Sequence, residues 1–179
     1  MSARSASATS RQSKLPLGSP QPEPCCTPQL RDAGVDADVE TFASFAQRRK
    51  ARAVALSVLY EVDIARHPAQ QCLAWELYGA LLSEDVVGFA RSLIDGVLAH
   101  QQELDSQIQL LAPAWPVAQL SPIDRNLLRM AIFEVTVTTT TPPKAAINEA
   151  VELAKLHGSE SSPRFINGVL GSVMDRAKQ

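Results

Sequence analysis

"SPIDRNLLRMAIFEV", residues 121–135, carries three independent signals that start a helix. Ser121 can cap the helix with its side-chain oxygen, the proline after it fits the first helical position, and the carboxylate of Asp124 can reach back to the cap. The helix should run to about Val137. The β-branched residues 135–141 would suit a strand, but no second strand-like run exists to pair with them, so we interpret them as a fraying helix end and loop.

The segment from Ser83 to Ala112 has the most regular helical spacing in the chain. Ser83 can cap it, Pro113 ends it, and its apolar residues follow a three-four alternation that is broken only at Gln101. We therefore predict one continuous helix whose apolar face packs on other helices. That face holds Val87, Ala90, Ile94, Val97, Leu104, Ile108 and Leu111.

Two more helices follow near the C-terminus. "KAAINEAVELAKLHG", residues 144–158, places its apolar side chains on one side, and Gly158 supplies a left-handed stop. Ser162 opens a last helix as its cap. With further helices over about 41–66 and 69–82, the chain should hold six or seven helices and no sheet. We predict an all-α helical bundle.

Prolines and serines are frequent in residues 1–40, which precede the predicted helical domain of residues 41–179. Such a composition buries too little apolar surface to offset its ordering entropy, so we predict a disordered extension. Its first 22 residues carry arginine, lysine and serine but no acid, which faintly resembles an organellar transit peptide. A dispensable tail is the better supported interpretation, because no amphipathic arginine-rich helix can be drawn there.

The 179 residues are 45% hydrophobic, which is enough for one domain with a core. The formal net charge is -2, so any site for a polyanion must be a local basic patch. No apolar run is long enough to cross a bilayer, and we expect no membrane partner. The three cysteines, Cys25, Cys26 and Cys72, form neither a disulfide framework nor zinc-ligand spacing, so we expect a reducing compartment, the cytoplasm.

Catalysis finds little support in the sequence. The three histidines, His67, His100 and His157, are scattered, and none has a cysteine or carboxylate at metal-ligand spacing. No glycine-rich phosphate loop or nucleophile motif is present. We therefore predict a protein that is not an enzyme and that needs no cofactor.

Four cations cluster at the beginning of "QRRKARAVALSVLY", residues 47–60. If a helix begins here, these cations meet the positive end of the helix dipole, which prefers carboxylates. An ordinary solvated face, or a helix that starts earlier at residues 36–40, would also explain the charge. We call the four cations the basic segment: Arg48, Arg49, Lys50 and Arg52.

Two of the cations, Arg49 and Arg52, point into the apolar arc of their own helix. Burying two arginines without partners would cost several kcal/mol. We infer that the packed core begins at Ala53 and that the arginines overhang the end of the bundle. The arc contains Phe42, Phe45, Ala53, Leu56, Leu59, Tyr60 and Ile64.

Three stretches of the chain resemble the family of the transcription antitermination factor NusB: "RRKARAVALSVLY", "LSPIDRNLLRMAIFE" and "KAAINEAVELAKLHGSESSPRFINGVLG". The resemblance covers about residues 47–174, in the family's order and spacing, and implies two packed helical sub-bundles. It also implies binding of single-stranded boxA-type RNA in ribosomal RNA leader transcripts, jointly with the ribosomal protein NusE. The complex lets RNA polymerase pass terminators.

The resemblance further implies which residues bind RNA. The family's basic start maps onto the basic segment, so RNA phosphate would supply the missing counter-charge. Other family contacts map onto Tyr60, Arg164 and Phe165, a mixture of cations and aromatic rings that suits single-stranded RNA. Ser161 stands where many members carry an acid, which would weaken the local repulsion toward RNA.

Other interpretations of these residues stay open. From spacing alone Phe165 would be a core residue, and Tyr60 lies on the apolar arc, so that only its hydroxyl need reach out. Asp124 is either the capping partner of Ser121 or the position at which the family meets NusE. Lys144, at the opening of its helix, is either a further phosphate contact or a solvated lysine.

Two functions of other classes compete with RNA-dependent antitermination. The helical domain of certain ribosomal RNA cytosine methyltransferases shares this fold by resemblance. That function needs a further catalytic domain, which we do not expect because the chain stops at Gln179. A purely protein-binding scaffold would bind its partner without RNA and without a strong dependence on salt.

Overall fold

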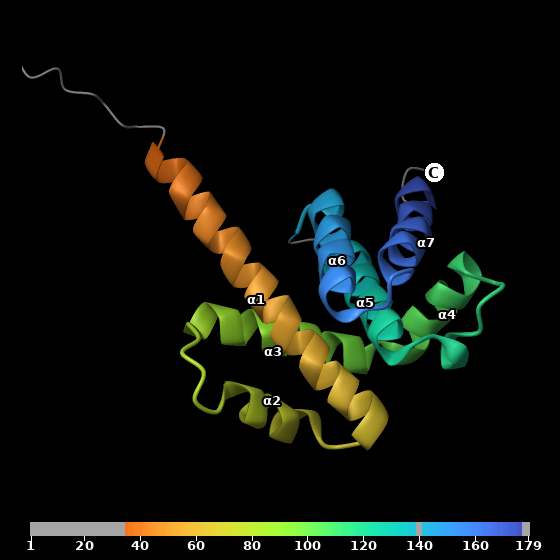
Figure 1. The fold of residues 1–179 in the computed structure, drawn as a ribbon, viewed down its shortest axis with the longest axis horizontal. Helices are drawn as coiled ribbons and strands as arrows, with labels where there is room; N and C mark the ends of the chain where they lie inside the picture. Colours follow the sequence, from red (N-terminus) through yellow and green to blue (C-terminus); the bar gives the residue numbers. More distant parts are fainter. Residues whose placement is uncertain (1–34, 139–140, 177–179) are drawn as a thin grey trace, which may run out of the picture. The chain divides into compact units, whose positions relative to one another are not determined.

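The computed structural model describes the backbone of residues 35–138 and 141–176. These residues form seven α-helices, a short 3-10 turn and a π-helical turn, and no strand lies among them (Figure 1). The predicted all-α fold is confirmed. The elements are α1 (Val35–Ala65), α2 (Ala69–Leu77), α3 (Glu84–Ala99), α4 (Gln101–Leu111), η1 (Val117–Gln119), α5 (Pro122–Phe133), η2 (Glu134–Thr138), α6 (Pro143–His157) and α7 (Ser162–Arg176).

Residues 1–34 of the predicted disordered extension lie outside the described residues. Helix α1 begins at Val35, so the backbone is already helical before the basic segment. The described helices hold no stretch that is both long enough and apolar enough to cross a membrane.

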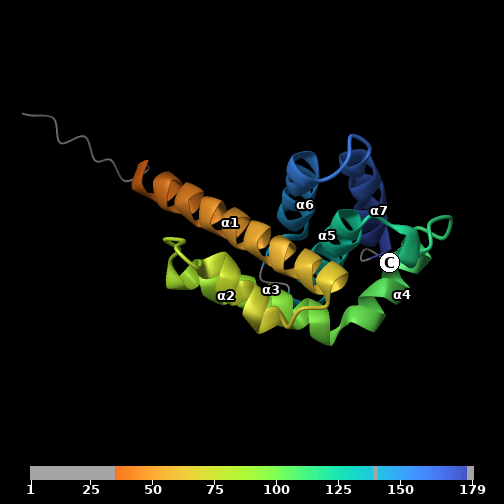
Figure 2. The ribbon, with the colours of Figure 1, turned by 60° about the horizontal axis from the view of Figure 1, so that its bottom comes forward.

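Helices α1 and α5 are the two elements on which the others pack (Figures 1 and 2). Helix α1 contacts α2 and α3, and α5 contacts α4, α6 and α7. Helices α1 and α3 also pack on α5, so both groups contribute to one core. This arrangement matches the two packed sub-bundles that the resemblance implies.

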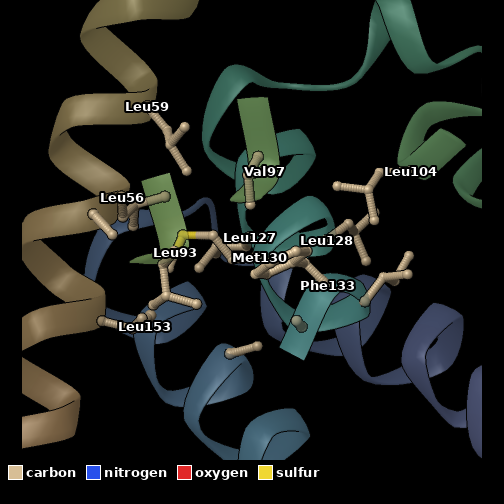
Figure 3. Packing of buried hydrophobic residues seen from close by; sticks show 14 of the residues in the cluster. Leu56, Leu59, Leu93, Val97, Leu104, Leu127, Leu128, Met130, Phe133 and Leu153 are labelled. Carbon is tan, nitrogen blue, oxygen red and sulfur yellow. The ribbon is translucent and has the colours of Figure 1, made fainter. Parts of the chain in front are cut away.

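Helix α5 is buried on nearly every side, because five other helices cover it. Its side chains Leu127 and Leu128 are no more than 1% exposed. Figure 3 shows them in one cluster with Leu56 from α1, Leu93 from α3 and Leu153 from α6. A helix in this position needs apolar residues over more than one stripe, which "LLRMAIF" provides.

The predicted continuous helix over 83–112 is wrong, because the chain breaks it into α3 and α4 at His100. His100 leaves helical geometry with φ -107° and ψ 15°, and its ring Nδ1 lies 2.9 Å from the carbonyl oxygen of Gly96. At Gly96 the helix comes so close to the ring of Phe133 in α5 that a Cβ would collide with it. The apolar spacing survives such a bend, so the pattern alone did not reveal it.

Of the predicted hydrogen bonds at the start of α5, the cap by Ser121 is confirmed and the reciprocal bond by Asp124 is wrong. The Oγ atom of Ser121 accepts a hydrogen bond of 3.1 Å from the backbone N–H of Asp124, as a helix cap does. The carboxylate of Asp124 does not bond back to the cap residue Ser121. Its Oδ1 atom is buried and has no partner among the described residues. At the other end α5 continues as the π-helical turn η2 to Thr138, close to the predicted end.

The turn from α6 to α7 also differs from the prediction. Gly158 ends α6 in an extended conformation, with φ -89°, and not in the left-handed one. Glycine is needed there for space, because a Cβ would lie 2.6 Å from the Cβ of Ser162. Ser162 belongs to α7, and its Oγ accepts a hydrogen bond of 2.9 Å from the backbone N–H of Ser159. It therefore braces the turn.

Candidate nucleic-acid interface

The basic segment lies in the middle of α1 rather than at its start, which corrects the premise of the helix-dipole argument. The dipole acts mainly within the first turn of a helix, and α1 begins far upstream at Val35. The alternative of an earlier helix start is therefore confirmed. The four cations need no special compensation for a helix terminus, and their individual partners explain them better.

Arg52 is an internal residue whose counter-charge is a carboxylate of the protein. Its guanidinium donates two hydrogen bonds, of 2.8 and 2.7 Å, to the carboxylate of Glu134 at the start of η2. The two side chains are only 3% and 2% exposed. The prediction that Arg52 overhangs the bundle is wrong, and the core begins at Ala51, which is fully buried, rather than at Ala53.

Arg48 is held at the edge of the same core by contacts to α3 and to the segment just before α6. Its guanidinium carbon lies 5.2 Å from the centre of the Phe89 ring in α3, and that of Arg52 lies 5.4 Å from it. Arg48 also donates a hydrogen bond of 3.1 Å to the Oγ1 atom of Thr141, just before α6. The side chain is half-buried, so only part of its charge faces the surface.

Arg49 is the outward-facing arginine of the segment. Its guanidinium donates two hydrogen bonds, of 2.8 and 2.7 Å, to the carboxylate of Glu149 in α6. We call this two-bond pair a fork. The hydrogen bonds that Arg49 donates to Glu149, together with the negative charge of that carboxylate, raise the pKa of Arg49. The arginine side chain remains 52% exposed, whereas that of Glu149 is 14% exposed. The outer face of the guanidinium is therefore open to solvent and to ligands.

Lys50 and Lys144 are exposed and form no ion pair with the described part of the chain. Lys144 lies in the first turn of α6, whose later turns carry the carboxylate that meets Arg49. The predicted cationic surface therefore consists of Arg49 and Lys50 with part of Arg48. The fourth member of the basic segment, Arg52, lies underneath it.

The predicted apolar arc of α1 holds at its centre and fails at its ends. Leu56 and Leu59 are buried, whereas Phe45, Tyr60 and Ile64 are 50%, 39% and 54% exposed. The side chain of Phe42 lies outside the described ones. Tyr60 is thus not a core residue, and its ring is available at the surface.

Phe165 is partly buried and partly exposed, so it is not simply a core residue. Its ring is partly buried and packs on the core from the first turn of α7. Its other side meets the indole of Trp115 edge to face, with ring centres 6.1 Å apart. The neighbouring Arg164 is exposed. An aromatic pair therefore lies beside a cation at the start of α7.

Trp115 is a candidate that the sequence reasoning missed. It is 59% exposed and lies in the loop between α4 and η1. The available signal was the tryptophan between two prolines in "PAWPV", which places a large ring with a polar edge in a surface loop. With Arg164 and Phe165 it lines a hollow of about 440 Å³.

A polar network fixes the elements behind this aromatic pair. Arg125 in α5 donates to Asp63 near the end of α1, at 3.0 Å from its Nε atom. Arg129, one turn further along α5, donates to both carboxylate oxygens of Asp105 in α4, at 2.7 and 2.8 Å. Its Nη1 atom also donates to Asn126 Oδ1. These bonds tie the beginning of α5 to α1 and α4.

Comparison with known proteins decides the family. A profile of the NusB family matches residues 49–175, most of the described chain. The chain belongs to the NusB family. Among its relatives, the transcription antitermination protein NusB of Dehalococcoides mccartyi (strain CBDB1) is 52% identical over 126 residues, 70% of this chain and 88% of that protein. NusB of Roseiflexus sp. (strain RS-1) is 44% identical over 134 residues, 74% and 94% of the two chains.

Solved structures of NusB proteins share the fold. NusB of T. maritima has a TM-score of 0.66 and 30% identity, over 70% of this chain and 89% of that chain. A second chain has a TM-score of 0.67 and 25% identity, over 73% of this chain and 98% of its own. It comes from a crystal structure of the antitermination factors NusB and NusE in complex with dsRNA. The resemblance to the NusB family is confirmed, and the RNA-binding roles of single residues stay predictions.

Proposed function

We propose that this protein is a transcription antitermination factor of the cytoplasm that binds boxA-type RNA in ribosomal RNA leader transcripts. It does so together with the ribosomal protein NusE, within the antitermination complex of RNA polymerase. It is a binding protein, not an enzyme, and uses no cofactor. Membership of the NusB family over residues 49–175 carries this proposal, and the likeness to a NusB chain solved with NusE and dsRNA supports binding of RNA together with NusE.

The outer cations are the proposed phosphate contacts. Arg49 and Lys50 in α1 and Lys144 in α6 are exposed, and Arg48 offers the part of its guanidinium that is not turned to Phe89. An RNA phosphate can bind the open face of Arg49 while Glu149 keeps the fork oriented. Each such contact adds affinity that falls as salt rises.

Arg52 has a different proposed role, because its buried pair with Glu134 leaves it no free face for a phosphate. It holds α1 against the end of α5 and presents the ring of Phe89 under Arg48. We therefore assign it to positioning the outer cations and not to binding RNA directly.

The aromatic residues are the proposed stacking partners of unpaired bases. Tyr60 on α1 and Phe165 on α7 both keep part of their rings at the surface. Arg164, beside Phe165, adds a cation for the phosphate next to the stacked base. Cations with neighbouring aromatic rings favour single-stranded RNA over a protein partner alone.

The test is a titration of fluorescent single-stranded boxA-type RNA with and without NusE, at several salt concentrations and beside a duplex of the same sequence. We expect tighter binding of the single strand, further tightening by NusE, and a logarithmic salt slope of about 0.7 for each phosphate contact. Binding of NusE that ignores both RNA and salt would identify a protein scaffold and contradict the proposal.

Two charge deletions sharpen the test. Arg49→Ala should lower the salt slope by about 0.7, the value of one contact with single-stranded RNA, without unfolding the protein. Arg91→Ala is the matched control, because Arg91 is exposed on α3 and lies about 200° around that helix from Phe89. An equal change of slope in both variants would show that the effect of Arg49 is general charge and not a contact.

A further inference from the structure

A groove of about 400 Å³ lies between the second half of α1 and the short helix α2, which turns back beside it (Figures 1 and 2). Its floor is apolar, because Val58 and Cys72 are no more than 2% exposed. Its walls carry one aromatic ring and two carboxylates. We call it the α1–α2 groove, and it is lined by Ser57, Val58, Glu61, Cys72, Trp75 and Glu76.

The charged and aromatic groups of the groove are open to a ligand. Trp75 is 52% exposed, and the side chain of Glu61 is 40% exposed. Burial, and after it the charge of Glu61, raise the pKa of the Cys72 thiol, so this carboxylate lies close to the groove floor. Glu76 is exposed and forms no ion pair with the described part of the chain. The groove therefore offers an indole and two carboxylates at one place.

His67 holds the two walls in a fixed relation. Its Nδ1 atom lies 2.8 Å from Glu61 Oε1, and its ring meets the indole of Trp75 edge to face, with ring centres 5.4 Å apart. The residue before it, Arg66, has a left-handed φ of 62° and donates its backbone N–H to the carbonyl oxygen of Val62, at 3.1 Å. This conformation ends α1 and turns the chain back toward the groove. The site is thus ordered before a ligand arrives, which lowers the cost of binding.

The charge of the groove selects a cation. Glu61 follows Arg49 by twelve residues, which places it about 18 Å further along α1 and about 120° around it. RNA phosphate would be repelled by the two carboxylates. A planar guanidinium fits them best, because it stacks on the face of a tryptophan and donates paired hydrogen bonds to a carboxylate.

Exposed apolar side chains beside the groove indicate that the cation belongs to a protein. Ile64 follows Glu61 by three positions on the same face of α1 and is 54% exposed. Tyr78 is 92% exposed, and its backbone N–H bonds to the carbonyl oxygen of Trp75 at 3.1 Å. Grouped apolar and aromatic side chains at a surface are typical of protein interfaces. A small free cation would leave them uncovered.

We propose that the α1–α2 groove binds an arginine side chain of a partner protein. Its guanidinium stacks on the indole of Trp75 and pairs with the carboxylates of Glu61 and Glu76. Apolar residues that flank the arginine in the partner cover Ile64 and Tyr78. This acidic surface is separate from the cations proposed to bind RNA, so the protein can hold RNA and this partner at the same time.

The experiment measures the affinity of the full chain for three fluorescent peptides of about twelve residues. The first alternates leucine and serine around three arginines, and in the others lysine or citrulline replaces the arginines. We expect the lysine peptide to bind about fivefold more weakly than the arginine peptide, because its ammonium group neither stacks as a plane nor forms a fork. The citrulline peptide keeps the shape without the charge and should bind at least about tenfold more weakly. Equal binding of the arginine and citrulline peptides would overturn the proposal.

Two charge deletions and a matched control place the arginine in the groove. Glu61→Gln and Glu76→Gln should each weaken binding of the arginine peptide by about fivefold. Glu103→Gln removes the same charge from an exposed position on α4 and should change the affinity less than about twofold. Thermal melts check that the variants stay folded. An equal effect of all three changes would show a general charge effect and overturn the assignment.

A fluorescence measurement tests the stacking separately. The chain has two tryptophans, so Trp115→Phe leaves Trp75 as the only one. Its emission should change when the arginine peptide saturates the protein and stay unchanged with boxA-type RNA. Unchanged emission with the peptide would overturn the placement on Trp75. An equal change with the RNA would identify a nucleic-acid surface and overturn the choice of partner.

Two further outcomes concern other occupants. Spermidine should compete with the arginine peptide only weakly, and displacement at concentrations similar to those of the peptide would identify a site for free polyamines and overturn the protein partner. Sedimentation should show the same oligomeric state for the wild-type protein and Trp75→Leu. A dimer that Trp75→Leu abolishes would identify a second copy of this chain as the occupant and overturn the separate partner. RNA affinity of Glu61→Gln that matches that of Glu103→Gln supports two separate surfaces.

Discussion

The buried pair of Arg52 and Glu134 permits the sharpest test of how the basic segment is built. Both side chains are at most 3% exposed and joined by two short hydrogen bonds. Arg52→Met leaves the carboxylate of Glu134 buried without a partner, which should lower the free energy of unfolding by about 3–5 kcal/mol. At about 2–4 °C for each kcal/mol in a protein of this size, the midpoint should fall by roughly 6–20 °C.

Two further variants make this prediction decisive. Replacing both partners, with Arg52→Met and Glu134→Leu together, should restore most of the stability, because no buried charge is left alone. Arg49→Met is the matched control, since it breaks an arginine fork of similar geometry whose arginine is half exposed, and should cost no more than about 1 kcal/mol.

Urea unfolding followed by circular dichroism gives the stabilities, and RNA titration of the same samples gives the affinities. The double variant should bind RNA almost as well as the wild-type protein, because neither residue is proposed to touch RNA and the apolar pair can still hold α1 against the end of α5. A stability loss below 1 kcal/mol for Arg52→Met, together with a salt slope reduced by one contact, would refute the buried pair. Arg52 would then be the phosphate contact that the family resemblance implied.

Three other expectations concern the core, the thiol and the aromatic site. Gly96→Ala should destabilise the fold by about 1–3 kcal/mol in urea unfolding, because the added methyl group would overpack the core. Gly88, on the same helix, has open space around it, so Gly88→Ala should stabilise the fold by about 0.5–1 kcal/mol. Burial raises the pKa of the Cys72 thiol. In a variant whose other cysteines are replaced by serine, a thiol reagent at pH 8 should therefore react slowly until the protein unfolds. Fast reaction of the native protein would contradict the burial of Cys72. Phe165→Ala should lower both stability and RNA affinity by about 1–3 kcal/mol, because one side of the ring packs on the core and the other is proposed to meet RNA. Thermal melts and titrations would contradict the dual role if only one of the two quantities changed.

The sequence was sufficient for the features that depend on spacing along one helix. The cap at Ser121, the helices over 144–158 and after 162, and the absence of sheet among the described residues follow from patterns within a few turns. The end of α5 near Val137 was also predictable. There, β-branched residues favour a helix that loosens, and the chain forms the π-helical turn.

Features that depend on contacts between distant residues were not predictable from one sequence. Arg52 and Glu134 are separated by 82 positions, and Arg49 and Glu149 by 100, so no local pattern pairs them. The bend at His100 likewise reflects the approach of α3 to the ring of Phe133. Because the sequence does not reveal those partners, Arg52 on the apolar arc was predicted to lie beyond the end of the packed core.

The ion pairs also change what the basic segment can contribute to binding. Two of its four cations already face carboxylates, so RNA cannot gain the full attraction of four free charges. Phosphate approaching Arg49 must share the guanidinium with Glu149, yet that carboxylate also fixes the fork, which lowers the ordering cost of the contact. The affinity should therefore come from a few positioned contacts together with stacking, and not from a dense positive field. On an acidic chain this arrangement favours RNA that offers unpaired bases at the right spacing, because attraction to the phosphate charge alone contributes too little affinity.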